Sequence, residues 1–338
     1  MILQLKRIFK FEFWPTWLFY LPVALYGLLL SLKARSITFF TAVNPGMKYS
    51  GGLEYSKMDY LRFLPKETVP KTILINKNIE NHKLQNLIIE QQFQFPLIVK
   101  PDKGQRGKEV KKVDSFNELI DFLIRASRDE FLLQEYIDYP LELGIFFVKT
   151  PDGKEEKITS ITKKKFLCAV GDGKSTLKKI VSRNIRAIDQ RSKLKKELKS
   201  QWNCVVPKGE EILLEPIGNH NRGTEFINAN NLISKELEHV ISWVASHIPD
   251  FYYGRIDLKT KSIDALLNKD LIVLEVNGVN SEPSHIYDTK TKIKNAYRDI
   301  FWHMNIMFKI SKQNKELKGV KTASFKEILV ALYQLYSH

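Results

Sequence analysis

Two apolar segments in the last third of the chain carry charged and amide side chains at alternating positions. Their sequences are YGRIDL over residues 253–258 and IVLEVNG over residues 272–278. Side chains of a strand alternate between its two faces, so Arg255 shares a face with Asp257, and Glu275 shares one with Asn277. Carboxylate and amide oxygens suit Mg²⁺, which takes its remaining ligands from water and phosphate groups.

Two explanations fit these polar positions. They could face solvent from two edge strands, or they could form a site inside the protein. The residues between them are apolar, which predicts buried strands, and a buried carboxylate without a partner is costly. We therefore predict a site for Mg²⁺ (or Mn²⁺) at Asp257, Glu275 and Asn277. Arg255 beside them can neutralise charge on a transferring phosphoryl group.

A lysine and a glycine-bearing loop form a second candidate, PLIVKPDKGQRGKEV, over residues 96–110. Lys100 ends an apolar segment and precedes a polar loop with Gly104 and Gly107. Glycine lets backbone amides approach a phosphate, and the lysine adds a point charge. A surface hairpin explains such a loop equally well. The segment GDGKST is not a P-loop, because Cys168 stands where that motif requires glycine.

The elements that must position these residues alternate between strands and helices without a regular βαβ repeat, which predicts an α+β fold. Period-two apolar segments predict strands near residues 36–43, 71–76, 97–100, 110–113, 131–137, 142–149, 211–217, 251–259 and 271–277. Helices are predicted near residues 56–64, 78–94, 115–126, 174–200, 234–247, 291–311 and 324–336. Ser115 and Glu118 form a capping box at the start of one helix.

Four segments occur in an order that resembles the ATP-grasp superfamily: Lys100 on its strand, QEYI, RID and LEVN. Within it the chain is most similar to the D-alanine–D-alanine ligase, glutathione synthetase and cyanophycin synthetase branch. GDGKST followed by a helix with Asn184 is similar to a segment of the last two. The resemblance covers about residues 56–310 and implies two α+β subdomains that clasp ATP. Relatives carry a whole N-terminal α/β domain for the first substrate, and here only residues 36–96 are available for that role.

The resemblance implies a role for each matching residue. Lys57 and Lys100 would be the two ATP lysines, residues 135–137 the adenine-facing hinge, and Glu142 the ribose ligand. One lysine of the run 163–165 would also reach the nucleotide. The implied nucleotide-binding residues are Lys57, Lys100, Gly104, Arg106, Gly107, Glu135, Tyr136, Ile137, Glu142 and Lys163. Arg255 and Lys100 would act on the transferring phosphate.

The implied substrate end of the site comprises two loops. His220 and Arg222 lie in the polar segment GNHNRGTE, and Asn280, Ser281 and Glu282 follow LEVN, where relatives bind substrate. An ordinary surface loop explains His220 and Arg222 as well as a binding role does.

The expected chemistry is ATP-dependent carboxylate–amine ligation. A small carboxylate would attack the γ-phosphate to give an acyl phosphate, and an amine (or thiol) would displace phosphate. The alternatives are a kinase-like phosphotransferase of the same fold and a non-catalytic, membrane-bound nucleotide-binding module.

The N-terminal segment raises the question of a membrane. Residues 14–32 carry no charge and are about as long as a bilayer-spanning helix, but Pro22 interrupts them. Basic residues flank both ends, which favours an interfacial or re-entrant hairpin at the cytoplasmic face of the membrane. A buried helix or a dimer surface is the alternative, and the oligomeric state stays open.

Charge and composition fit this picture. The net charge is +15, and residues 163–199 hold thirteen lysines and arginines against three acidic residues. Such a patch attracts phosphates, acidic substrates or an anionic membrane surface. It has few aromatic residues and no recognised nucleic-acid module, which argues against nucleic acid. Two cysteines fit a reducing compartment. The expected division is an N-terminal apolar segment (1–35), a short preceding region (36–96), the ATP-grasp domain (97–312) and a C-terminal amphipathic helix (313–338).

Overall fold

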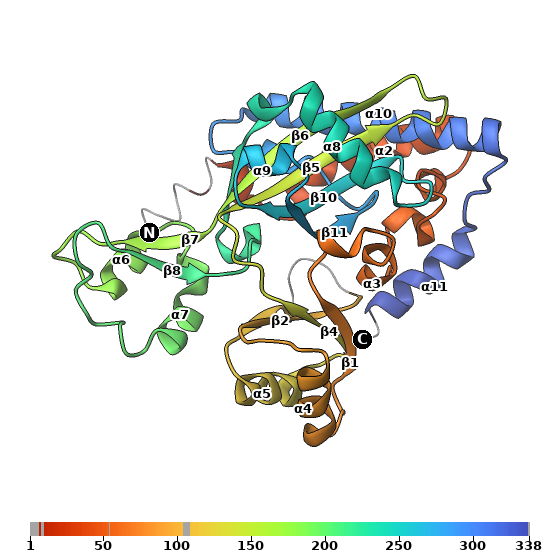
Figure 1. The fold of residues 1–338 in the computed structure, drawn as a ribbon. Helices are drawn as coiled ribbons and strands as arrows, with labels where there is room; N and C mark the ends of the chain where they lie inside the picture. Colours follow the sequence, from red (N-terminus) through yellow and green to blue (C-terminus); the bar gives the residue numbers. More distant parts are fainter. Residues whose placement is uncertain (1–6, 8–9, 54, 104–108, 337–338) are drawn as a thin grey trace.

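Three antiparallel sheets organise the chain in the computed structural model, which describes residues 7, 10–53, 55–103 and 109–336. Each sheet has its own apolar core. The fold is mixed α and β, as the sequence predicts. Figure 1 shows the largest sheet in the upper part of the molecule, a smaller helix-backed sheet below it, and a two-stranded unit at one side.

The lower unit is a four-stranded sheet with the order β1-β4-β2-β3, backed by two helices (Figure 1). Its elements are β1 (Thr72–Asn76), α4 (Asn81–Glu90), β2 (Leu97–Pro101), β3 (Lys111–Val113), α5 (Phe116–Arg125) and β4 (Glu130–Glu135). The predicted capping box is confirmed, since the Ser115 hydroxyl accepts a hydrogen bond from the Glu118 amide. Leu84, Leu119 and Leu133 pack into the same buried core, so both helices close one face of the sheet.

The central sheet carries the predicted polar strands and has the order β11-β10-β5-β6-β9. Its strands are β5 (Leu141–Lys149), β6 (Glu156–Lys165), β9 (Glu225–Asn228), β10 (Tyr253–Thr260) and β11 (Leu271–Asn277). Helices α8 (Lys235–Ser246) and α9 (Ile263–Leu267) cover one face (Figure 1). Helix α10 (Ile293–Lys318) packs on the other through Ile306 and Ile310, which meet Phe146 of β5. Helices on both faces keep β10 and β5 buried.

A small third unit occupies the basic stretch of the sequence. It pairs β7 (Leu167–Val170) with β8 (Glu211–Glu215) and adds α6 (Leu177–Arg183) and α7 (Arg191–Glu197). The prediction of one helix over residues 174–200 is wrong. The backbone becomes extended at Asn184, whose side chain accepts a hydrogen bond from the Arg186 amide. This break lets Val181 and Leu194 enter one core.

The N-terminal apolar segment forms a single helix, α2 (Thr16–Ala34), so the predicted hairpin is wrong. Pro22 lies on the exposed side of α2 and removes one hydrogen bond without ending the helix. Packing against α10 compensates: Tyr297 donates a hydrogen bond to the Phe19 carbonyl, and Tyr26 bonds Asn305. By length and composition alone, α2 could cross a membrane.

Two other expectations need correction. Residues 36–43 form no strand but the 3-10 turn η2 (Phe39–Ala42), because side chains of α10 occupy their backbone groups. Ser311 donates to the Phe39 carbonyl and Asn314 to the Ala42 carbonyl. The expected boundaries at 96 and 312 also fall inside structural units, since β1 pairs with β4 and α10 continues to Lys318 before α11 (Phe325–Tyr336).

The connections are short helical turns. They are η1 (Phe11–Phe13), η3 (Lys48–Gly51), α3 (Lys57–Leu61), η4 (Lys66–Thr68), η5 (Ile188–Gln190), η6 (His220–Arg222), η7 (Asn230–Leu232) and η8 (Ser284–Tyr287).

Candidate active site

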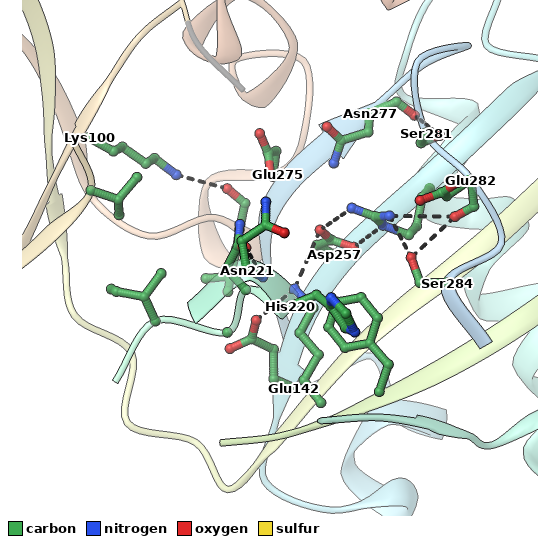
Figure 2. Close-up of a pocket in the computed structure, with 18 of the residues that line it drawn as sticks. Lys100, Glu142, His220, Asn221, Asp257, Glu275, Asn277, Ser281, Glu282 and Ser284 are labelled. Atoms are coloured by element: carbon green, nitrogen blue, oxygen red, sulfur yellow. Dashed lines mark hydrogen bonds and ion pairs between the residues drawn. The ribbon is translucent and has the colours of Figure 1, made fainter. Parts of the chain in front are cut away.

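A cavity of about 510 Å³ lies between the four-stranded sheet and the central sheet. Strand β2 lines it from one side, and β10 and β11 line it from the other. Further walls come from Tyr136 and Ile137, in the segment that joins the two sheets, and from side chains within residues 11–20. Most of the predicted site residues meet in this cavity (Figure 2).

The two predicted polar strands are hydrogen-bonded neighbours. Arg255 of β10 is paired with Asn277 of β11, and Asp257 is paired with Glu275. Alternation therefore places all four side chains on one face, and all four line the cavity. Figure 2 shows three of them, Asp257, Glu275 and Asn277, at this cavity.

Arg255 and Asp257 form a bidentate ion pair in the cavity. Arg255 Nε lies 2.7 Å from Asp257 Oδ1, and its terminal nitrogen lies 3.1 Å from Oδ2. Burial alone would raise the pKa of Asp257, but Arg255 and then Lys164 outweigh it, so the pKa is lowered. Arg255 also donates to the Ser284 hydroxyl at 2.8 Å, which leaves its guanidinium fixed in the cavity wall.

Gly144 on the adjacent strand β5 makes room for this pair. A Cβ atom at residue 144 would lie 3.0 Å from Asp257 Oδ1 and 3.1 Å from Arg255 Cδ. Gly144 is paired with Asp257 across the two strands, so any larger side chain would push directly on the ion pair.

Two buried lysines, one on the four-stranded sheet and one on α3, lie beside β11. Lys100 of β2 donates to the Leu274 carbonyl at 3.2 Å, and Lys57 of α3 lies 3.9 Å from Glu275 Oε1. Burial lowers the pKa of Lys100 to about 8, and the pKa of Lys57 is lowered for the same reason. Two ammonium groups that have lost much of their hydration inside a cleft attract an anion strongly.

A third lysine in the site is Lys164, where the sequence pointed to Lys163. Strand β6 turns Lys163 outward and directs Lys164 into the cavity. Lys164 Nζ lies 2.8 Å from Glu142 Oε1 and 3.5 Å from Asp257 Oδ2. Lys259 adds a further cation 3.9 Å from Glu142 Oε2. The expected ribose ligand Glu142 thus sits between two buried lysines.

The expected hinge follows β4. Glu135, Tyr136 and Ile137 line the cavity where the chain leaves the small sheet for the central one. Lys259 donates to the Ile137 carbonyl at 2.7 Å, and its ammonium lies over the Tyr136 ring. The Ile137 backbone is therefore anchored to β10. Gly104, Arg106 and Gly107 lie outside the residues that the structure describes.

The side chains at residues 257, 275 and 277 are the predicted ligands for a divalent cation. No close cluster of three His, Cys, Asp or Glu side chains occurs among the described residues. Asn277 carries an unsatisfied buried amide nitrogen, while its Oδ1 accepts a hydrogen bond from Tyr55 at 2.7 Å. After a rotation of this amide by half a turn, its nitrogen would donate to the Tyr55 hydroxyl and its oxygen would take the unsatisfied position. Two carboxylates and an amide oxygen are donors of the type that Mg²⁺ takes together with phosphate and water oxygens.

The substrate end of the cavity agrees only in part with expectation. His220, Asn280 and Ser281 line the cavity. Arg222 does not: it lies 3.2 Å from Glu215 Oε1 and donates to the Val110 carbonyl at 2.8 Å. Arg222 therefore joins the third unit to the start of β3.

Several lining residues were not found from the sequence. They are Glu12, Tyr20, Tyr55, Lys259 and Tyr287. Lys259 had a detectable signal, because it continues the alternation of Arg255 and Asp257 along β10. Tyr20 had none, since its approach to the cavity depends on how α2 packs against α10.

Comparisons with known proteins give matches among solved structures. No protein-family model and no curated protein matches the chain. The D-alanine–D-alanine ligase from Bacillus anthracis is 15% identical with a TM-score of 0.47, over 81% of this chain and 72% of that one. The enzyme of the same name from Coxiella burnetii is 9% identical with a TM-score of 0.45, over 86% of this chain and 64% of that one.

A bifunctional glutathione synthetase from Pasteurella multocida is 15% identical with a TM-score of 0.39. The match covers 72% of this chain and 35% of the synthetase, so this chain spans about a third of that enzyme. All three TM-scores are below 0.5. The chain is similar to ligases of the branch that its motifs resemble.

Proposed function

We propose that the chain is an ATP- and Mg²⁺-dependent ligase that activates a small carboxylate as an acyl phosphate for attack by an amine (or thiol). One observation carries this proposal. A single cavity holds two buried lysines, Lys57 and Lys100, opposite an arginine and three oxygen-bearing side chains. Cations on one wall and metal-type donors on the other are what a triphosphate with its metal requires.

The nucleotide would lie along β2 and the segment after β4. Lys100 and Lys57 supply positive charge beside the phosphates, and both are poorly hydrated before the nucleotide arrives. The backbone at Ile137, held by Lys259, offers a fixed edge for the base. Glu142 lies between Lys164 and Lys259, within reach of hydroxyl groups of the sugar.

Mg²⁺, when bound, would supply charge neutralisation and orient the phosphate oxygens, held by Asp257, Glu275 and Asn277. The protein's own part is mainly positioning. Arg255 is locked by Asp257 and Ser284, so its guanidinium stabilises charge that develops on the transferring phosphoryl group without reorganising. Lys164 balances the second oxygen of Asp257 and keeps that carboxylate ionised.

Hydroxylamine trapping tests this proposal. The protein is incubated with ATP, Mg²⁺, hydroxylamine and a panel of amino acids, hydroxy acids and peptides, and both ADP and hydroxamate are measured. The proposal predicts equal amounts of both with at least one acid, and loss of both in Arg255→Ala. ADP with a stable phosphorylated product and no hydroxamate would favour the kinase-like alternative. Tight ATP binding without turnover would favour the non-catalytic module.

The outer face of α2 supports a location at the inner face of the cell membrane. Seven large apolar side chains on this face are exposed: Trp17, Leu18, Leu21, Leu25, Leu28, Leu29 and Leu32. The opposite face packs on α10, so an in-plane position suits α2 better than a span. Exposed Lys10, Lys33 and Arg35 flank the stripe and complement anionic headgroups.

Vesicle sedimentation tests this location. The chain should sediment with vesicles that contain phosphatidylglycerol and less with neutral phosphatidylcholine vesicles. Leu25→Glu with Leu28→Glu should abolish sedimentation, because both side chains are more than half exposed on the stripe. Leu317→Glu is the matched control, because Leu317 is an exposed apolar side chain of α10 and lies outside the apolar face of α2. Wild-type protein that stays in the supernatant with both vesicle types would contradict the proposal.

A further inference from the structure

One partly buried carboxylate in the cavity has no role in the activation step. Glu282 follows β11 and lines the cavity (Figure 2). Its side chain accepts a hydrogen bond from the Tyr20 hydroxyl and also bonds Tyr287. Among the described residues, no lysine, arginine or histidine forms an ion pair with Glu282. Burial raises the pKa of this carboxyl to about 7.

The surroundings of Glu282 come from three elements that meet at the substrate end. Tyr20 belongs to α2, Tyr287 to η8, and the two tyrosine hydroxyls lie 2.9 Å apart. On β10, the Arg255 guanidinium contacts the backbone carbonyl of Glu282 at 3.5 Å. Behind Tyr287 stands His220, with ring centroids 5.3 Å apart. The backbone of Glu282 thus lies beside the arginine proposed to face the phosphoryl group, and its side chain bonds the two tyrosines.

A partly buried carboxylate with only tyrosine side-chain partners is poorly compensated. Two phenol hydroxyls can share a proton with it, but they cannot neutralise its charge. A cation that entered the cavity would compensate the charge of Glu282. An ammonium group suits this place, because it can donate hydrogen bonds to the carboxylate and to the two tyrosine hydroxyls.

We propose that Glu282, together with Tyr20 and Tyr287, forms the subsite for the acceptor's ammonium group, and that Glu282 removes its proton. The acceptor class is a primary alkylamine. This inference rests on the proposed ligase function and deepens it. It also gives the N-terminal segment a place in the chemistry, because α2 supplies Tyr20.

The proton balance of the step is as follows. The acceptor arrives as R–NH₃⁺, and Glu282 takes one proton to leave R–NH₂. The amine lone pair forms a bond to the carbonyl carbon of the acyl phosphate, and the carbon–oxygen bond to phosphate breaks. The second proton leaves nitrogen with the departing phosphate. The products are the amide, hydrogen phosphate and protonated Glu282, which returns its proton to water.

Comparing two kinds of acceptor tests the inference. Hydroxylamine is mostly uncharged at neutral pH and needs no base before it attacks. The alkylamines to be tried, ethanolamine, glycinamide and glucosamine, carry ammonium groups. The donor acid is the one identified by hydroxamate trapping. Glu282→Gln keeps the size of the side chain and a hydrogen-bond acceptor for Tyr20. It should leave hydroxamate formation within about threefold of wild type and lower transfer to the alkylamine about 100-fold or more.

The pH profile gives a readout that a purely structural role would not move. With the alkylamine, kcat/KM of wild type should rise with pH through about 7, the pKa of Glu282, and then level off. In Glu282→Gln this step should vanish, and the rate should keep rising as free amine accumulates. Tyr20→Phe should lower alkylamine transfer about tenfold, while Tyr26→Phe, on the same helix but bonded to Asn305, should match wild type.

Each other outcome overturns the inference. Equal losses with hydroxylamine and the alkylamine would make Glu282 a support of the fold. Unchanged alkylamine transfer in Glu282→Gln, or hydroxamate formation with no alkylamine accepted, would remove the ammonium subsite. Failure to form any hydroxamate in wild type would instead overturn the ligase proposal itself, and the inference with it.

Discussion

The low pKa of Lys100 makes ATP affinity sensitive to alkaline pH. Lys100 is buried, and desolvation brings its pKa to about 8 from an ordinary value near 10.5. A phosphate beside the ammonium would restore the charged form, so below about pH 8 the lysine is already protonated and ATP binds at full strength. Above that pH, binding must first take up a proton. The dissociation constant for ATP should then rise up to about tenfold per pH unit, or about 1.4 kcal/mol.

The assay is calorimetric titration of a non-hydrolysable ATP analogue with Mg²⁺ at several pH values from about 7 to 9.5. Buffers of different ionisation enthalpy would reveal the proton taken up above about pH 8. Lys100→Arg is the matched variant, because a guanidinium stays charged throughout this range. The ATP affinity of Lys100→Arg should fall less than that of wild type as the pH rises. We assign the fall that remains to Lys57, whose pKa is also lowered. Wild-type affinity that stays constant across the range would refute the reasoning.

Three further predictions concern packing around the site. Gly144→Ala should fold but lose about tenfold or more in kcat, measured as ADP release, because its Cβ would displace the Arg255–Asp257 pair by a few tenths of an ångström. Lys164→Met should lower the free energy of unfolding in urea by about 3 kcal/mol, since it removes the nearer of the two cations beside Glu142, while Lys163→Met should change it little. His303 is buried among aromatic rings with an unpaired Nδ1, and its pKa is lowered to about 3, so the unfolded chain binds the proton more readily. Stability should fall as pH drops below about 6.5, and His303→Leu should reduce that loss, seen in the midpoint of thermal unfolding against pH.

Sequence periodicity was sufficient for the strands that carry the site. Alternation along β10 and β11 placed Arg255 with Asp257 and Glu275 with Asn277, because a buried strand leaves little freedom in which side chains share a face. It could not choose among Lys163, Lys164 and Lys165. Alternation separates the middle lysine from its neighbours but does not say which face of β6 lines the cavity.

Long-range packing decided what the sequence could not. Residues 36–43 have the composition of a strand, yet polar side chains of α10 take up their backbone groups, and a turn results. Pro22 suggested a break, but the contact of α2 with α10 outweighs one lost hydrogen bond. The approach of Tyr20 to Glu282 joins positions 262 residues apart, and no local pattern contains it.

The central claim is that a carboxylate oxygen attacks the γ-phosphate in the cavity around Arg255. Transfer of ¹⁸O tests it most directly. The donor acid is labelled with ¹⁸O at its carboxylate. The ³¹P NMR spectrum of the released phosphate should then show one ¹⁸O per molecule, because phosphate leaves the acyl group together with one oxygen of the acid. Unlabelled phosphate released alongside ligated product would contradict the account.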